Sequence, residues 1–206
     1  MKGGNDMNRI VECDVDGVLL DIYTPVEEAL KRQGIEFSFK DSVKTWGMKE
    51  IGPLRNTIIP MLLDAELRSQ AQWMTGAKDF VKQLSDLCEQ LGYTLVLNTH
   101  ERYYATAKVK LSLLQELAAE TEVNFEINVQ CGYVKEMLKS YICIDDSLDN
   151  IVRSKSKNPL LFNSFHNTEL YNGYRCNIHR VDGYSGVLRA ITDIQKGVLQ
   201  YSVLAV

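Results

Sequence analysis

The sequence lacks the features that mark several large classes of protein. Its five cysteines are an odd number and include no CxxC pair, so neither a zinc site nor a set of disulfides is expected. No apolar run approaches the ~18 residues of a membrane span, and the opening MKGGNDMNR has no apolar signal core. We therefore expect a cytoplasmic protein with buried thiols and no membrane attachment.

The sequence also lacks an excess of positive charge. Its 23 basic and 27 acidic residues give a net charge of -4, which argues against stable binding of nucleic acid through many phosphates. There are no repeats or low-complexity tracts. A length of 206 residues with 45% hydrophobic content fits one buried core with an insert, or two small domains. Small molecules are the expected partners.

The predicted elements alternate between strands and helices. Apolar runs predict strands at residues 9–13, 93–100, 124–129, within 140–150, and 159–163. Apolar residues at helical spacing predict helices at 24–33, 77–90, 102–120 and 184–197, with Thr24 capping the first and Ser147 a short further helix. Strands separated by helices, without hairpin signals, form parallel sheets. We expect a Rossmann-like α/β fold: a parallel sheet covered by helices on both faces, with a small helical insert at residues 35–73 that includes a short helical stretch at 62–70.

Three of the predicted strands end in polar side chains. Strand by strand, these are Asp14 and Asp16, then Thr99 and His100, then Asp145 and Asp146. The carboxyl ends of parallel strands lie at one edge of a sheet, where ligands bind, so we expect a single site there. Four carboxylates in one site repel one another and need a cation, and Mg²⁺ prefers such hard oxygen ligands. The sequence therefore predicts a magnesium site built from these four carboxylates.

The same carboxylates suit phosphoryl transfer. Asp14, at the strand end, is predicted to attack phosphorus and form an acyl phosphate, which divides a difficult hydrolysis into two displacements. Asp16, which is followed by a turn at Gly17, is predicted to protonate the leaving oxygen and later to take a proton from the attacking water. Asp145 and Asp146 are predicted to anchor the metal, one directly and the other through water.

Thr99 and a lysine are expected to hold the phosphoryl group. Thr99 can donate its hydroxyl and N–H to a phosphoryl oxygen, and a lysine must neutralise the charge that builds on the transferring group. Lys135 is preferred because it lies shortly before the strand that ends at Asp145. The sequence leaves three alternatives for this lysine: Lys108, Lys110 and Lys139.

Each of these residues also has a purely structural interpretation. Asp14 and Asp16 could form a solvated turn, and the acidic pair near residue 145 could favour a helix N-terminus. Thr99 could be an ordinary strand residue. His166 and His179 lie outside the predicted site and are expected to be structural or on the surface.

Taken in order along the chain, the motifs resemble those of the haloacid dehalogenase superfamily of phosphatases. The first motif, DxDG, stands here as Asp14-Val15-Asp16-Gly17, and the second, a strand that ends in Thr or Ser, ends in Thr99. The third is a lysine, here Lys135, and the fourth is the acidic pair Asp145-Asp146, with Asn150 beyond it. The resemblance covers residues 10–150 and implies a Mg²⁺-dependent phosphomonoesterase with an aspartyl-phosphate intermediate.

Within the superfamily, the chain is most similar to the 5'(3')-deoxyribonucleotidases, which carry a small helical cap between the first two motifs. The resemblance implies a core formed by residues 1–20 and 75–206 and a cap formed by residues 21–74. It also implies hydrolysis of (deoxy)nucleoside 5'-monophosphates, with Trp46 of the cap stacking on the base, although Trp46 could instead pack inside the cap. The family usually has Ser after the second-motif Thr; here His100 would contact the substrate and bring a titrating group near the phosphate.

Other functions fit the same motifs. The substrate could be a sugar phosphate or a nucleic-acid 3'-phosphate, and the phosphoryl group could pass to an acceptor alcohol. A protein that keeps the fold and only binds its ligand is a further alternative, against which the intact carboxylates argue. The apolar tail QYSVLAV could be a docked end or a contact in a homodimer.

Overall fold

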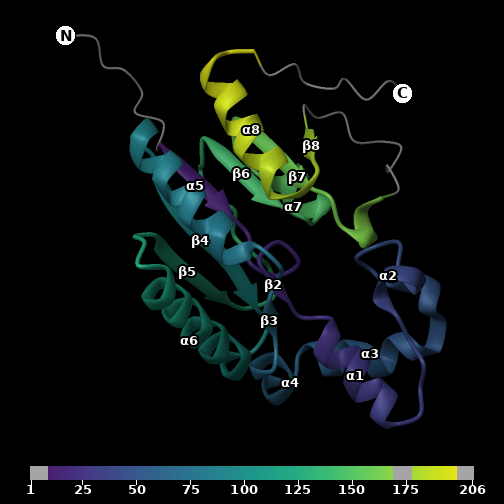
Figure 1. The fold of residues 1–206 in the computed structure, drawn as a ribbon. Helices are drawn as coiled ribbons and strands as arrows, with labels where there is room; N and C mark the ends of the chain where they lie inside the picture. The colour runs from purple at the N-terminus through teal and green to yellow at the C-terminus, as the bar shows by residue number, and fades with distance from the viewer. Residues whose placement is uncertain (1–8, 169–177, 199–206) are drawn as a thin grey trace, which may run out of the picture.

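Six parallel strands form the main sheet of the computed structural model, which describes residues 9–168 and 178–198. Their spatial order is β5-β4-β1-β6-β7-β8 (Figure 1). The bounds are β1 Ile10–Cys13, β4 Thr94–Glu101, β5 Glu126–Cys131, β6 Ile142–Asp145, β7 Asn158–Phe162 and β8 His179–Val181. The predicted parallel α/β sheet is confirmed. The edge strand β8 was not predicted, because three residues are too few to show a period.

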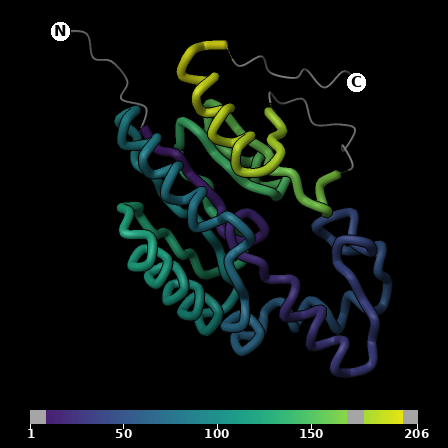
Figure 2. Tube along the Cα trace, in the orientation of Figure 1, coloured from purple at the N-terminus to yellow at the C-terminus, as the bar shows by residue number. Residues whose placement is uncertain are grey.

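One face of the sheet packs against three helices. These are α5 Ala77–Leu91, α6 Tyr104–Thr121 and α8 Gly183–Gln195, close to their predicted ranges. Figures 1 and 2 show α5 and α8 lying side by side across the sheet, and Phe80 of α5 stacks on Tyr184 of α8 with ring centroids 4.4 Å apart. The inward side chains of these helices bury the alternate apolar residues of the strands, such as Val11 and Cys13 of β1.

The opposite face has a smaller apolar cluster. There Ile151 of α7, which spans Leu148–Arg153, packs on Cys143 of β6 and Leu161 of β7. Ser147 caps α7 by accepting a hydrogen bond from the N–H of Asn150 at 3.4 Å, as the sequence predicts. Helices therefore lie on both faces, but α7 covers only the β6 and β7 side of the second face.

The segment between β1 and α5 is mostly helical. It contains β2 Leu20–Asp21, α1 Thr24–Arg32, α2 Phe39–Ser42, a 3₁₀-helix Lys49–Leu54, α3 Arg55–Leu62, α4 Ala65–Ser69 and β3 Gln72–Trp73. Antiparallel pairing of β2 with β3 brings the two ends of the segment together, and Figure 2 shows its helices beside one end of the sheet. The insert is confirmed as helical, while the division into a core and a cap at residues 21–74 stays a prediction.

Two local details of the insert differ from the sequence-based expectation. Thr24 is already helical, and Tyr23 stands at the N-cap of α1 without a capping side chain; the carboxylate of Asp21 accepts hydrogen bonds from the N–H groups of Tyr23 and Thr24 at 2.9 and 3.1 Å. The stretch expected to be helical at residues 62–70 forms α4 only from Ala65 to Ser69, because Asp64 leaves the helical conformation and caps α4 by accepting from the N–H of Leu67.

Two further expectations concern the state of the cysteines and the absence of a membrane-spanning segment. Cys13, Cys88 and Cys143 are buried free thiols and Cys131 is exposed, whereas Cys176 and the tail QYSVLAV lie outside the described residues. Across residues 9–168 and 178–198, no helix has both the length and the apolar character that a membrane span requires.

Candidate active site

The ends of β1 and β6 bring three carboxylates together. The two strands are neighbours, with Val11 paired to Ile142, so the residues that follow them emerge side by side. One oxygen each of Asp14, Asp145 and Asp146 lie within 4.8 Å of one another, and all three residues are buried. Burial raises the pKa of all three carboxyl groups; the charge of Asp145 raises that of Asp14 further, to about 7.

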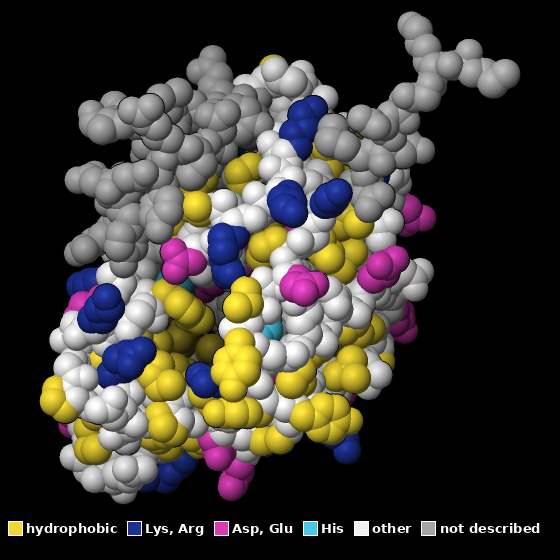
Figure 3. Space-filling model, turned by 180° about the vertical axis from the view of Figure 1, so that it is seen from behind, with side chains coloured by type: hydrophobic (Ala, Val, Ile, Leu, Met, Phe, Trp, Pro, Cys, Tyr) yellow, Lys and Arg dark blue, Asp and Glu magenta, His cyan; other side chains and the backbone are white. Residues whose placement is uncertain are grey.

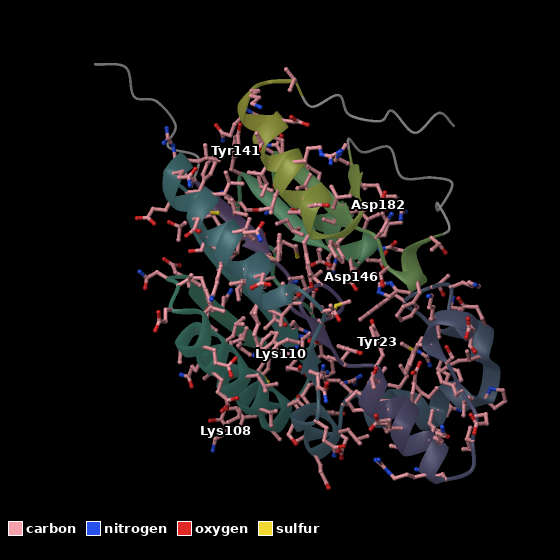
Figure 4. The ribbon with its side chains drawn as sticks, in the orientation of Figure 1. Tyr23, Lys108, Lys110, Tyr141, Asp146 and Asp182 are labelled. Atoms are coloured by element: carbon pink, nitrogen blue, oxygen red, sulfur yellow. The ribbon has the colours of Figure 1, made fainter. Side chains whose placement is uncertain are left out.

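A buried lysine lies against this carboxylate group. The Nζ atom of Lys135 is 2.8 Å from Oδ1 of Asp14 and 2.7 Å from Oδ2 of Asp145. Burial lowers the pKa of its ammonium group, but the two carboxylates outweigh burial and hold the pKa well above its ordinary value. Among the alternatives, Lys108 and Lys139 are exposed, and Figure 4 shows Lys108 pointing away from the sheet. Lys135 is therefore the lysine that contacts the predicted nucleophile.

The two residues of the acidic pair have different partners. Asp145 accepts hydrogen bonds from the N–H of Ser147 at 2.8 Å and from Nδ2 of Asn150 at 3.2 and 3.1 Å. Oδ2 of Asp146 lies 2.9 Å from Nε2 of His166, which is buried in a short 3₁₀-helix after β7. The expectation that His166 lies outside the site is wrong: it follows the next strand of the sheet, and that position was its only signal.

Asp16 is not part of the group of three close carboxylates and pairs instead with two cations. Its Oδ2 atom lies 2.6 Å from Nζ of Lys110 and 3.3 Å from Nη1 of Arg68. Both cations also contact Glu101, at 2.5 Å from Lys110 and 3.3 Å from Arg68. Burial alone would raise the pKa of Asp16, but the two cations outweigh it and lower the pKa. The structure therefore brings three of the four predicted metal ligands together and places the fourth in a separate buried ion cluster.

The second strand of the site contributes Thr99 and His100. The hydroxyl of Thr99 accepts a hydrogen bond from Nζ of Lys110 at 3.0 Å, so Lys110 links Thr99 to Asp16. Figure 4 shows Lys110 on the side of α6 that faces the sheet. His100 is half-buried, and burial lowers the pKa of its imidazole. Lys110 had been one of three alternatives, and Arg68 gave no signal because nothing in the sequence pairs α4 with the first motif.

Trp46 lies at the mouth of the site rather than inside the insert. It is 45% exposed, and its ring centroid is 5.0 Å from that of His166. A recess of about 230 Å³ is lined by Trp46 together with Asp14, Asp16, Thr99, His100, Tyr133, Val134, Lys135, Asp146, Ser147, Asp149, Asn150 and Arg153. The recess thus brings together every residue predicted for the site except Asp145, which lies fully buried beneath it.

A second, more apolar recess has Gly17 in its wall. It measures about 800 Å³, and its walls include Tyr23, Phe39, Met74 and Phe165. Tyr23 and Phe165 make an edge-to-face contact with centroids 4.9 Å apart. The space-filling view from behind shows hydrophobic side chains gathered around a hollow (Figure 3). Aromatic side chains therefore line both recesses.

Gly17 is required by a close approach of Asp146 as well as by its backbone. Its φ is +72°, and a Cβ there would lie 1.9 Å from Oδ2 of Asp146. We expect Gly17→Ala to lower both the free energy of unfolding and turnover, because the methyl group must displace that carboxylate. Gly34 is a matched control, since its φ is +77° with no atom within 4 Å of the added Cβ.

Urea unfolding of the two variants separates the cost of the left-handed backbone conformation from the cost of the steric clash with Asp146. Gly34→Ala should lose about 1 kcal/mol from the left-handed conformation alone, and Gly17→Ala roughly 1–3 kcal/mol more from overpacking. Equal losses, with activity retained in both variants, would show that Asp146 can move away freely.

Comparison with solved structures shows the same fold at low sequence identity. A haloacid dehalogenase-like hydrolase from Streptococcus pneumoniae aligns with a TM-score of 0.55 and 13% identity, covering 90% of this chain and 99% of its own. A protein from Haemophilus somnus described as a predicted phosphoglycolate phosphatase aligns with a TM-score of 0.53 and 11% identity, covering 92% of this chain and 100% of its own. No curated protein matches the sequence.

The parallel sheet is the fold of hydrolases of the haloacid dehalogenase type, and the family model that the chain matches makes the protein a phosphoric monoester hydrolase of this type. The chain belongs to the family described as 5' nucleotidase, deoxy (pyrimidine), cytosolic type C protein, which it matches over residues 8–191. The match extends well beyond residues 10–150, where the motifs lie.

Proposed function

We propose that this phosphatase hydrolyses (deoxy)nucleoside 5'-monophosphates with Mg²⁺ and an aspartyl-phosphate intermediate on Asp14. The observation that carries the proposal is the group of three buried carboxylates, whose oxygens approach within 4.8 Å while Lys135 contacts two of them. One ammonium group does not balance three carboxylates, and burial raises the pKa of all three. A hard divalent cation on Asp14, Asp145 and Asp146 would relieve this repulsion.

The metal, when bound, supplies positive charge that offsets the charge of the phosphoryl group. Asp14 attacks the phosphorus: an Asp14–phosphorus bond forms and the ester phosphorus–oxygen bond breaks. We take Oδ2 as the attacking atom because Oδ1 already accepts from Val15 N–H and from Lys135 Nζ, each at 2.8 Å. Lys135 thus holds the carboxylate in one orientation and can also face the phosphoryl oxygens, as Thr99 can with its hydroxyl.

Asp16 transfers protons in both halves of the proposed reaction. It gives a proton to the leaving oxygen, and it takes one from the water that attacks the acyl phosphate. Lys110 and Arg68 lower its pKa and hold it ionised, which is the state needed for the second half. The first half requires a protonated carboxyl, so Asp16 must leave these two cations as the substrate binds.

The substrate proposal rests on the family and on the aromatic walls. The family name specifies a 5'-nucleotidase, and the exposed Trp46 at one recess and the half-buried Phe165 at the other offer aromatic surfaces to a base. A sugar phosphate or a nucleic-acid 3'-phosphate remains the second candidate. The proposed partner is thus a small phosphate ester, while the homodimer and the cytoplasmic location stay predictions.

Trp46→Ala tests the substrate proposal. Loss of base stacking should raise KM for a nucleoside 5'-monophosphate roughly tenfold to a hundredfold, while hydrolysis of a sugar phosphate changes little. Steady-state kinetics on a panel of nucleotides, sugar phosphates and a 3'-phosphorylated oligonucleotide measures this. Tyr104→Ala is a control, since that aromatic is 78% exposed and lines neither recess. A preference for sugar phosphates, unaffected by Trp46→Ala, would reject the nucleotide.

A further inference from the structure

Lys135 lies on a segment that no helix supports. Within the described chain, residues 132–141 join β5 to β6 without forming a helix or a strand. The segment crosses the face of the sheet that α7 leaves open, over β1, β4 and β5. Lys135 is nevertheless 7% exposed and contacts both Asp14 and Asp145. Other groups must therefore hold its backbone in place.

Polar side chains of the sheet hold this backbone directly. Gln130 of β5 binds the peptide groups of Glu136 in both directions: its Nε2 donates to the carbonyl oxygen at 2.8 Å and its Oε1 accepts from the N–H at 2.6 Å. Asn98 of β4 donates to the same carbonyl oxygen at 3.1 Å. Glu136 is the residue after Lys135, so these three hydrogen bonds fix the main chain beside the lysine.

The same network continues across the sheet face to β1. Nε2 of Gln130 also donates to Oδ1 of Asn98 at 2.7 Å, and Nδ2 of Asn98 donates to the carboxylate of Glu12. Glu12 is buried and accepts from the hydroxyl of Ser140 at 3.1 Å. Asn98 directly precedes Thr99 on β4, and Glu12 lies two residues before Asp14 on β1, so the network links β5 and two strands of the site to the lysine segment.

We propose that Gln130 is a positioning residue that, with Asn98, clamps the backbone at Glu136 and thereby holds Lys135 against Asp14 and Asp145. The inference rests on the proposed function, because it assumes that Lys135 contacts the phosphoryl group. Gln130 touches neither substrate nor metal in this account: it replaces the hydrogen bonds that a helix would have given the segment. A displacement of about 1 Å at such a group costs on the order of a hundredfold in rate.

A double-mutant cycle tests whether Gln130 acts through Lys135. Gln130→Ala should lower kcat/KM roughly tenfold to a hundredfold in the otherwise native protein, and less than about twofold when Lys135 is already alanine. Asn128→Ala is the matched control: Asn128 donates to Asn98 Oδ1 at 2.9 Å from the same strand, with no hydrogen bond to Glu136. It should leave kcat/KM within about threefold of native.

Binding of inorganic phosphate with Mg²⁺, measured by calorimetry, provides a readout that needs no turnover. The loss of affinity caused by Gln130→Ala should likewise vanish in the Lys135→Ala background. Equal losses in both backgrounds would overturn the positioning role, because Gln130 would then act independently of the lysine. If Lys135→Ala itself changed neither phosphate affinity nor kcat, the role of Lys135 in the proposed function would fail instead. Urea unfolding and the exchange rate of the Glu136 amide show whether each variant is folded and whether the clamp is released.

Discussion

Asp14→Asn should lower kcat by about 10⁴-fold or more while leaving the protein folded. An amide cannot form the acyl phosphate, and no other carboxylate among the described residues occupies the end of β1 in its place. The amide keeps the size of the side chain and its hydrogen bond with the N–H of Val15. Fixed-time assays of released phosphate measure the remaining activity. They are run at high enzyme concentration with a nucleoside 5'-monophosphate and with an aryl phosphate.

The stability of this variant carries its own prediction. Burial raises the pKa of Asp14 to about 7, so the ionised carboxylate is unfavourable in the folded metal-free protein. Removing that charge should leave the free energy of unfolding in metal-free buffer unchanged or higher above pH 7. Asp86→Asn, at an exposed carboxylate of α5, serves as the control with native activity. Native turnover by a purified Asp14→Asn protein would contradict the assignment of the nucleophile.

Removal of Mg²⁺ by a chelator should abolish turnover, and its return should restore it. The affinity of the protein for Mg²⁺ should also depend on pH. Asp14 must lose its proton to bind metal, and its pKa of about 7 means that it keeps the proton below that pH in the metal-free fold. Affinity for Mg²⁺ should therefore weaken by about tenfold for each unit below pH 7 if one proton is released, and level off above it.

The raised pKa of Asp14 also determines how the stability of the metal-free protein varies with pH. A carboxyl whose pKa rises from 3.8 to about 7 on folding binds more protons in the folded state, so its contribution to stability falls as pH rises between those two values. Thermal unfolding with and without Mg²⁺ should diverge most above pH 7. Asp145→Asn should weaken this effect of Mg²⁺, whereas Asp86→Asn should not. A stabilisation by Mg²⁺ that is independent of pH and of Asp145 would place the ion elsewhere.

The main elements of the fold were predictable because their signals are local. Buried parallel strands are continuous apolar runs and their helices are amphipathic, so α5, α6 and α8 lie close to their predicted ranges. The strand β8 was not predicted because its three residues pair only with β7. The start of α4 at Ala65, inside the stretch expected to be helical from residue 62, depends on a single cap at Asp64.

The meeting of Asp14 with Asp145 and Asp146 was also predictable, since parallel neighbours deliver their ends to one edge. The contacts that each of the four carboxylate side chains makes were not predictable. Asp16 lies two residues from Asp14, yet it turns to Lys110 and Arg68, because those cations approach from α6 and α4. Sequence spacing contains no information on such contacts between remote elements.

His166 and Gln130 illustrate the same limit. His166 contacts Asp146 only because β7 lies beside β6. Gln130 holds the lysine segment only because the chain between β5 and β6 forms no helix and crosses the sheet face instead. In each case the contact depends on strand order or on the path of a loop, and neither is encoded in a short motif.

The stereochemical course at phosphorus tests most directly whether a carboxylate of this site becomes phosphorylated. A substrate made chiral at phosphorus with isotopically labelled oxygen and sulfur passes through two in-line displacements if Asp14 forms an acyl phosphate. Each displacement inverts the phosphorus, so we expect net retention of configuration in the released thiophosphate. Net inversion would show that water attacks the substrate directly and that Asp14 is not phosphorylated.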